Sequence, residues 1–148
     1  MIPQKDRENL KALFASGLAG PVQCTFFTQQ QSALAAPGVE CEYCKETREL
    51  LEEVVALTSL VSLDTHDFVT EAALAKTHGV DRIPAIELKG KAKGRVRFFG
   101  VPAGYEFSTL VEDLLDVASG QTKLSAATKA QLATLTQPVH LQVFVTPT

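Results

Sequence analysis

The sequence predicts an α/β fold in which helices cover a mixed four-stranded sheet. Helical and strand patterns alternate along most of the chain, which is typical of parallel strands joined by right-handed crossovers. The last two predicted strands are separated only by a short glycine-containing turn at residues 89–94, so they must pair as an antiparallel hairpin. With 148 residues and 45% hydrophobic content, the chain can bury the core of about one ordinary domain.

Each predicted element follows from a local pattern. Apolar residues recur every three or four positions in the helical segments, while β-branched and aromatic residues fill the short strand segments between glycine or proline stops. The expected helices cover about residues 6–18, 44–57, 71–80 and 104–118, and the expected strands lie in 22–28, 59–64, 84–90 and 94–100. Residues 29–40 lack a period and contain a Pro-Gly turn signal, so we interpret them as a surface loop, with its three glutamines as filler. This αβαβαββα order is the plan of a thioredoxin-like fold.

The end of the chain resembles its beginning. The segment QPVHLQVFV follows a helical pattern, as GPVQCTFFT does, and in both segments a valine follows the proline and a phenylalanine comes six residues after it. We therefore predict that residues 1–120 form one thioredoxin-like unit and that residues 121–148 supply the helix and first strand of a truncated second repeat. An apolar strand over 139–145 needs a partner, so we expect it to join a sheet or to form a homo-oligomer.

Composition excludes several function classes. The 14 Lys and Arg residues are outnumbered by 17 Asp and Glu, so no basic surface favours nucleic acid. The N-terminal sequence lacks the apolar core of a secretory signal, and no stretch reaches the roughly 20 apolar residues of a membrane span. Three cysteines without an export signal fit catalysis or sensing better than a disulfide framework. We therefore expect a cytoplasmic protein.

Cys41 and Cys44 form a CxxC motif where a predicted helix begins. Unpaired backbone N–H groups at a helix start stabilise a thiolate, so we expect a moderately lowered pKa for Cys41, although acidic and basic neighbours oppose each other there. Cys44 is close enough along the chain to attack a mixed disulfide formed at Cys41. The motif therefore predicts an attacking thiol at Cys41 and a resolving thiol at Cys44, with Tyr43 covering the sulfur.

Other interpretations of the cysteines stay open at this point. The pair could be structural, or it could be half of a zinc site, but tetrahedral zinc needs four ligands and the chain offers no second CxxC or HxxxH motif. Cys24 alternates with apolar residues on a predicted strand, which indicates a buried core position. His66 follows a predicted strand, and we interpret it as a solvated loop residue without a chemical role.

Pro84 is a candidate for the residue against which an extended substrate peptide would pack. An X-Pro bond can be cis at modest cost, and a cis proline facing the cysteines would leave the backbone of Ile83 free to pair with an extended peptide. We therefore predict Tyr43, Ile83 and Pro84 as substrate-binding residues beside the two cysteines.

Several motifs together resemble a known family. The segments CEYC, RIPAIEL, RFFGVPAGYEFSTLVEDLLDV and PVHLQVFVTPT are similar to the N-terminal unit of the protein disulfide oxidoreductases, tandem glutaredoxin-like proteins of thermophilic archaea and bacteria. The resemblance spans nearly the whole chain, and its most specific part is the GxPAGxEF run. It implies that Cys41 and Cys44 are the N-terminal redox pair and that Pro84 is the cis proline. A related arrangement occurs at the N-terminus of the alkyl hydroperoxide reductase flavoprotein, where only the second of two fused units is redox active.

These observations predict a thiol-disulfide oxidoreductase that acts on protein dithiols and disulfides in cell redox homeostasis. It would need no metal or flavin cofactor and would receive electrons from a thioredoxin reductase-like donor. The alternative is a redox-weak interaction or scaffold unit, either of a tandem thioredoxin-like protein or of an alkyl hydroperoxide reductase flavoprotein.

Overall fold

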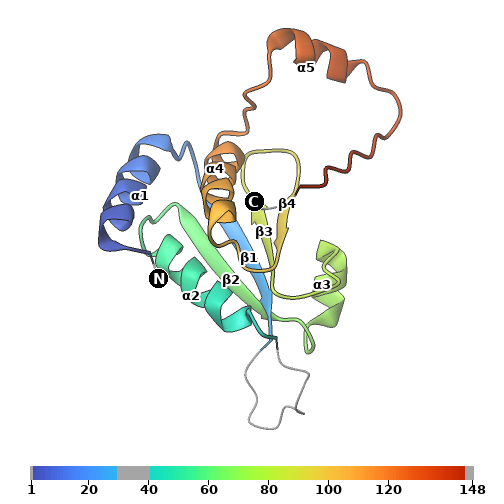
Figure 1. Ribbon diagram of the computed structural model, residues 1–148. Helices are drawn as coiled ribbons and strands as arrows, with labels where there is room; N and C mark the ends of the chain where they lie inside the picture. The colour runs from blue at the N-terminus through green and yellow to red at the C-terminus, as the bar shows by residue number, and fades with distance from the viewer. Residues whose placement is uncertain (1, 30–40, 146–148) are drawn as a thin grey trace.

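The computed structural model describes residues 2–29 and 41–145, and its elements follow the predicted order (Figure 1). The elements are α1 (Gln4–Gly17), β1 (Val22–Thr28), α2 (Cys44–Val55), β2 (Val61–Asp67), α3 (Ala72–His78), β3 (Ala85–Lys89), β4 (Val96–Phe99), α4 (Tyr105–Ser119) and α5 (Ala126–Ala133). The αβαβαββα prediction is therefore confirmed. The predicted loop lies almost wholly outside the described residues.

The four strands form one mixed sheet in the order β2-β1-β3-β4. β1 pairs with β2 in parallel, and β3 pairs with β1 and with β4 in antiparallel orientation. The parallel pair is joined through α2, while the antiparallel pair is the predicted hairpin. This arrangement confirms the thioredoxin-like fold class.

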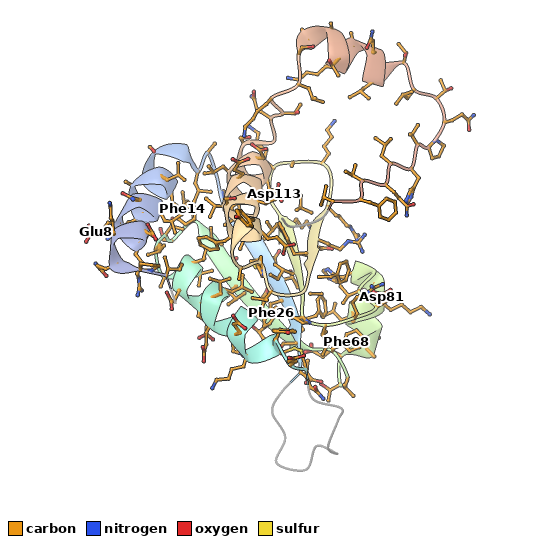
Figure 2. All side chains as sticks on the ribbon, in the orientation of Figure 1. Glu8, Phe14, Phe26, Phe68, Asp81 and Asp113 are labelled. Atoms are coloured by element: carbon orange, nitrogen blue, oxygen red, sulfur yellow. A yellow bond between two sulfur atoms is a disulfide. The ribbon has the colours of Figure 1, made fainter. Side chains whose placement is uncertain are left out.

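The two faces of the sheet are covered differently. One face carries the main core, in which β1 and β3 pack against α1, α2 and α4 around the fully buried Phe14 and Phe26 (Figure 2). The other face carries a smaller cluster in which Phe27 packs with Ala75 of α3. Neighbouring residues of β1 point to opposite faces, and both faces are covered, so only Gln23 of its seven residues is exposed.

β2 differs from its prediction in both bounds and extent. It starts at Val61 and continues to Asp67, paired with β1 along its whole length. His66 therefore lies inside the strand, and its interpretation as a solvated loop residue was wrong. The segment was misjudged because β2 is an edge strand with several exposed polar residues, and its pairing with β1 cannot be read from local polarity.

The C-terminal segment contains a helix but no strand among its described residues. α5 begins after Ser125, whose side chain accepts a hydrogen bond from the Thr128 N–H. Residues 139–145 pair with no described strand, and Leu141, Val143 and Phe144 are 82–89% exposed. A strand exists only with a ladder partner, and the described part of the chain provides none for this segment. No second repeat is therefore seen within residues 121–145, and the division into two units stays a prediction.

Candidate active site

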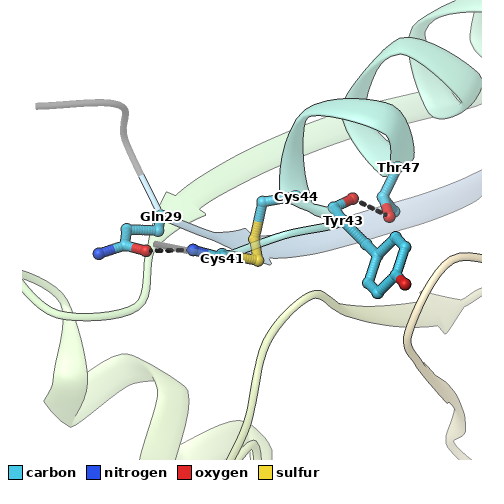
Figure 3. Close-up of a disulfide and its surroundings, with 5 residues drawn as sticks. All are labelled: Gln29, Cys41, Tyr43, Cys44 and Thr47. Carbon is cyan, nitrogen blue, oxygen red and sulfur yellow. Dashed lines mark hydrogen bonds between the residues drawn. A yellow bond between two sulfur atoms is a disulfide. The ribbon is translucent and has the colours of Figure 1, made fainter. Parts of the chain in front are cut away.

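Cys41 and Cys44 form a disulfide at the start of α2, with their Cα atoms 5.4 Å apart (Figure 3). Cys44 is the first residue of the helix and is only 4% exposed, whereas Cys41 lies in the preceding turn and is half-buried. An incoming sulfur can therefore reach Cys41 more easily than Cys44. This difference matches the predicted order in which Cys41 attacks and Cys44 resolves.

Two polar side chains hold the turn that carries the disulfide. The Cys41 N–H donates to Oε1 of Gln29 at 2.8 Å, which ties the turn to the end of β1. The Thr47 hydroxyl donates to the carbonyl oxygen of Tyr43 at 2.7 Å, one helical turn back (Figure 3). Sequence reasoning missed both residues and interpreted Gln29 as loop filler. The contact of Thr47 could have been predicted from its position in the first turn of the helix. The contact of Gln29 could not, because it joins residues 12 apart in the sequence.

The charges around the turn are mixed. Lys45 forms an exposed ion pair with Glu49 at 3.9 Å, and the Arg48 guanidinium lies 6.0 Å from the centre of the Phe26 ring. Tyr43 is 45% exposed, and a hydrogen bond with the side chain of Glu42, together with its negative charge, raises the pKa of the phenol. The Tyr43 hydroxyl therefore stays protonated at neutral pH.

Pro84 lies at the same end of the sheet as the disulfide. The Ile83–Pro84 peptide bond is cis, as the sequence predicted. In the ladder between β1 and β3, Ala85 pairs with Phe27. The next step along the ladder brings Pro84 beside Thr28, the residue that precedes Gln29 in the sequence. Pro84 is buried and Ile83 is half-buried. The topology thus brings the proline to the strand end that holds Cys41, while its role in packing against a substrate peptide stays a prediction.

His66 and His78 belong to the opposite face of the sheet. Their rings lie 5.6 Å and 5.3 Å from the ring of Phe27, measured between centroids. His66 Nδ1 lies 2.8 Å from Glu71 Oε1, and this hydrogen bond, with another from the Asp67 N–H, lowers the pKa of Glu71. His78 Nδ1 contacts the buried Glu87 at 2.9 Å. These contacts give both histidines a structural role around Phe27.

Residues 2–29 and 41–145 contain no group of three or more His, Cys, Asp or Glu side chains arranged to hold a metal ion. In the oxidised state the sulfurs of Cys41 and Cys44 are bonded to each other, so neither is a thiolate ligand. Within the same ranges no helix has the length and apolar content to span a bilayer.

The mixed sheet and the CxxC disulfide at the start of α2 define a thioredoxin-like protein with a dithiol site. No protein-family model matches the chain. The F subunit of alkyl hydroperoxide reductase from Staphylococcus epidermidis is 29% identical over 103 residues, which is 70% of this chain and 18% of that protein. This chain therefore spans less than a fifth of the length of the curated relatives it matches.

Two solved structures are similar over most of the chain. A protein disulfide oxidoreductase from Aeropyrum pernix has a TM-score of 0.74 and 23% identity, covering 91% of this chain and 56% of that one. The F subunit of alkylhydroperoxide reductase from Enterococcus faecalis has a TM-score of 0.73 and 25% identity, covering 90% of this chain and 60% of that one. Together with the strand order, these similarities show a thioredoxin-like fold.

Proposed function

We propose that the protein is a thiol-disulfide oxidoreductase that exchanges electrons with protein dithiols and disulfides. The observation that carries this proposal is the Cys41–Cys44 disulfide, in which one sulfur is accessible and the other is buried at the helix start. The similarity to a protein disulfide oxidoreductase and to the F subunit of alkyl hydroperoxide reductase supports it.

In the reducing direction, the Cys41 thiolate attacks one sulfur of a substrate disulfide and releases the other as a thiolate. Cys44 then loses its proton and attacks Cys41, which forms the internal disulfide and releases the second substrate thiolate. Two electrons pass from the enzyme dithiol to the substrate, and each released thiolate takes up a proton. Tyr43, Ile83 and Pro84 form the surface on which the substrate chain rests, because the sheet topology brings the proline to the end that carries the disulfide.

The test is insulin reduction by the chain in the presence of a dithiol. The parent protein accelerates precipitation of the insulin B chain, while Cys41→Ser reduces the rate to that of the dithiol alone. Equal rates for the parent protein and Cys41→Ser would exclude the proposed function.

The remaining proposals concern the cellular setting. We place the protein in the cytoplasm, in cell redox homeostasis, with a thioredoxin reductase-like protein as electron donor. We also propose that residues 121–148 begin a second thioredoxin-like unit and that the exposed strand-like segment 139–145 supports a homo-oligomer. A mass measurement over a dilution series tests self-association, and a monomer at every concentration would exclude it.

A second candidate function rests on the similarity to the F subunit of alkyl hydroperoxide reductase. In this case the chain is a redox-weak interaction unit of a longer protein, and the disulfide is structural. The insulin assay separates the two candidates, because an interaction unit leaves the dithiol rate unchanged.

A further inference from the structure

Thr28 carries a buried hydroxyl that lacks a partner. It is the last residue of β1 and is 1% exposed, yet its Oγ1 has no hydrogen-bond partner within the described part of the chain. Buried hydroxyls in proteins are almost always hydrogen-bonded, so an unpaired one requires an explanation. Its position at the strand end directly before Gln29 puts it next to the disulfide turn.

The hydroxyl belongs to the face of the sheet that α2 covers. Phe26 packs in the core cluster with residues of α2, whereas Phe27 packs with α3, so alternation along the strand directs Thr28 toward α2. The helix runs antiparallel to β1, because the chain that leaves α2 returns to the start of the strand, where Val22 N–H donates to the Leu60 carbonyl at 2.8 Å.

The side chain of Arg48 on α2 reaches Phe26 on β1. Its guanidinium lies 6.0 Å from the centre of the Phe26 ring. Two residues forward along a strand and one turn back along a helix are each about 5–7 Å. Because the two elements are antiparallel, Thr28 of the strand and Cys44 of the helix lie at the same end of this pair, where Gln29 Oε1 accepts a hydrogen bond from the Cys41 N–H.

Building on the proposed function, we propose that the Thr28 hydroxyl donates a hydrogen bond to the Cys44 sulfur once the disulfide is reduced, which makes Thr28 a positioning residue for the resolving step. A disulfide sulfur is a poor acceptor, which accounts for the unpaired hydroxyl in the oxidised protein. A thiolate is a strong, charged acceptor, so the contact forms in the state that attacks.

The hydroxyl is not consumed in this step. Cys44 gives its proton to water, and its thiolate, held by Thr28, attacks the Cys41 sulfur of the mixed disulfide. The Cys41–Cys44 bond forms, the bond to the substrate breaks, and the substrate leaves as a thiolate that takes up a proton. The contact favours the charged form of Cys44, so its loss is visible in the titration of that thiol.

The test compares Thr28→Val with Thr28→Ser, both in a Cys41→Ala background so that Cys44 remains a free thiol. Valine keeps the shape of threonine without the hydroxyl, while serine keeps the hydroxyl. The Cβ chemical shift of Cys44 is followed by NMR against pH. We expect Thr28→Val to raise the titration midpoint by roughly one pH unit, a tenfold change in the equilibrium, and Thr28→Ser to leave it near the parent value.

Thr25→Val is the matched control, because Thr25 is a buried threonine of β1 on the opposite face of the sheet. Charged groups near the site, including Glu42, Glu46, Arg48 and Asp67, are unchanged in every variant. An unshifted midpoint in Thr28→Val, or an equal shift in Thr25→Val, would overturn the proposal. If Thr28→Val does not fold, a crystal structure of the reduced protein decides, since an Oγ1 turned away from the Cys44 sulfur would also overturn it.

The titration uses no substrate, so it is independent of turnover. If the parent protein reduces insulin but Thr28→Val does not shift the titration midpoint of Cys44, only the proposed role of Thr28 is excluded. A shift in a protein that does not reduce insulin would establish the contact and exclude the oxidoreductase function.

Discussion

Burial gives the three cysteines different chemistry. Cys41 is accessible from the turn before α2, while Cys44 is covered at the first position of the helix. Cys24 lies in the centre of β1, 2% exposed, and desolvation raises the pKa of its thiol from 9.0 to about 12. Cys24 therefore stays protonated at neutral pH, while the proposed disulfide exchange involves Cys41 and Cys44.

The buried Cys24 thiol predicts a loss of stability at alkaline pH. Its pKa is higher in the folded than in the unfolded chain, so its contribution is complete below pH 9.0 and is lost as the pH rises toward about 12. Between these values the free energy of unfolding should fall by about 1.4 kcal/mol per pH unit more steeply in the parent protein than in Cys24→Ala. Denaturant unfolding at several pH values measures the two slopes, and parallel slopes would contradict the burial of this thiol.

The CxxC spacing was sufficient to predict that Cys41 and Cys44 lie close together, and the structure joins them in a disulfide. Their catalytic roles stay predictions. The placement of Cys24 in the core followed from alternation along β1 and is confirmed. The role of Gln29 could not be predicted. Its hydrogen bond with the Cys41 N–H joins residues 12 apart in the sequence, and a local pattern does not encode such a contact.

At the scale of elements, the β3–β4 hairpin is fixed against α4 by close backbone contact. A Cβ added at Gly90 would lie 2.8 Å from the carbonyl oxygen of Val117, and the same oxygen accepts a hydrogen bond from Ala92 N–H at 3.1 Å. At Gly94, at the other end of the same loop, a Cβ would meet nothing within 4 Å. The hairpin therefore tolerates a side chain at one end of its loop only.

This asymmetry predicts different effects for two equivalent substitutions. Gly90→Ala should reduce the free energy of unfolding by roughly 2 kcal/mol, because backbone atoms of α4 would have to shift. Gly94→Ala should change it by less than about 0.5 kcal/mol. Urea denaturation of the two variants and the parent provides the comparison. Equal effects of the two substitutions would show that the loop does not pack on α4 as described.

Most elements could be predicted from local patterns because their apolar faces are regular. The helix ends at Gly79 and Gly120 were predicted from glycine alone, and both residues have the left-handed backbone that favours it, with φ of 66° and 65°. β2 was predicted too short because its continuation to Asp67 depends on pairing with β1 rather than on its own polar sequence. The pairing of β2 with β1 is visible only in the structure.

At the scale of the whole molecule, one compact unit ends with α4, and a segment with exposed apolar residues follows. Val139, Leu141, Val143 and Val145 occupy alternate positions, which is the pattern of a strand buried on one face, yet they are 60–87% exposed. Large exposed apolar segments usually mark interaction sites. The sequence predicts a strand here, and residues 139–145 form none in the structure, because a strand also needs a partner, which a sequence pattern cannot supply.

In the proposed mechanism Cys41 receives the substrate and Cys44 releases it. Trapping of the mixed disulfide distinguishes the roles of the two cysteines. Reduced Cys44→Ser is mixed with a peptide disulfide, quenched with acid and mapped by mass spectrometry, with reduced Cys41→Ser treated in parallel. We expect a stable peptide adduct on Cys41 of Cys44→Ser and little or no adduct on Cys44 of Cys41→Ser. An adduct of equal amount on Cys44, or none on Cys41, would contradict this mechanism.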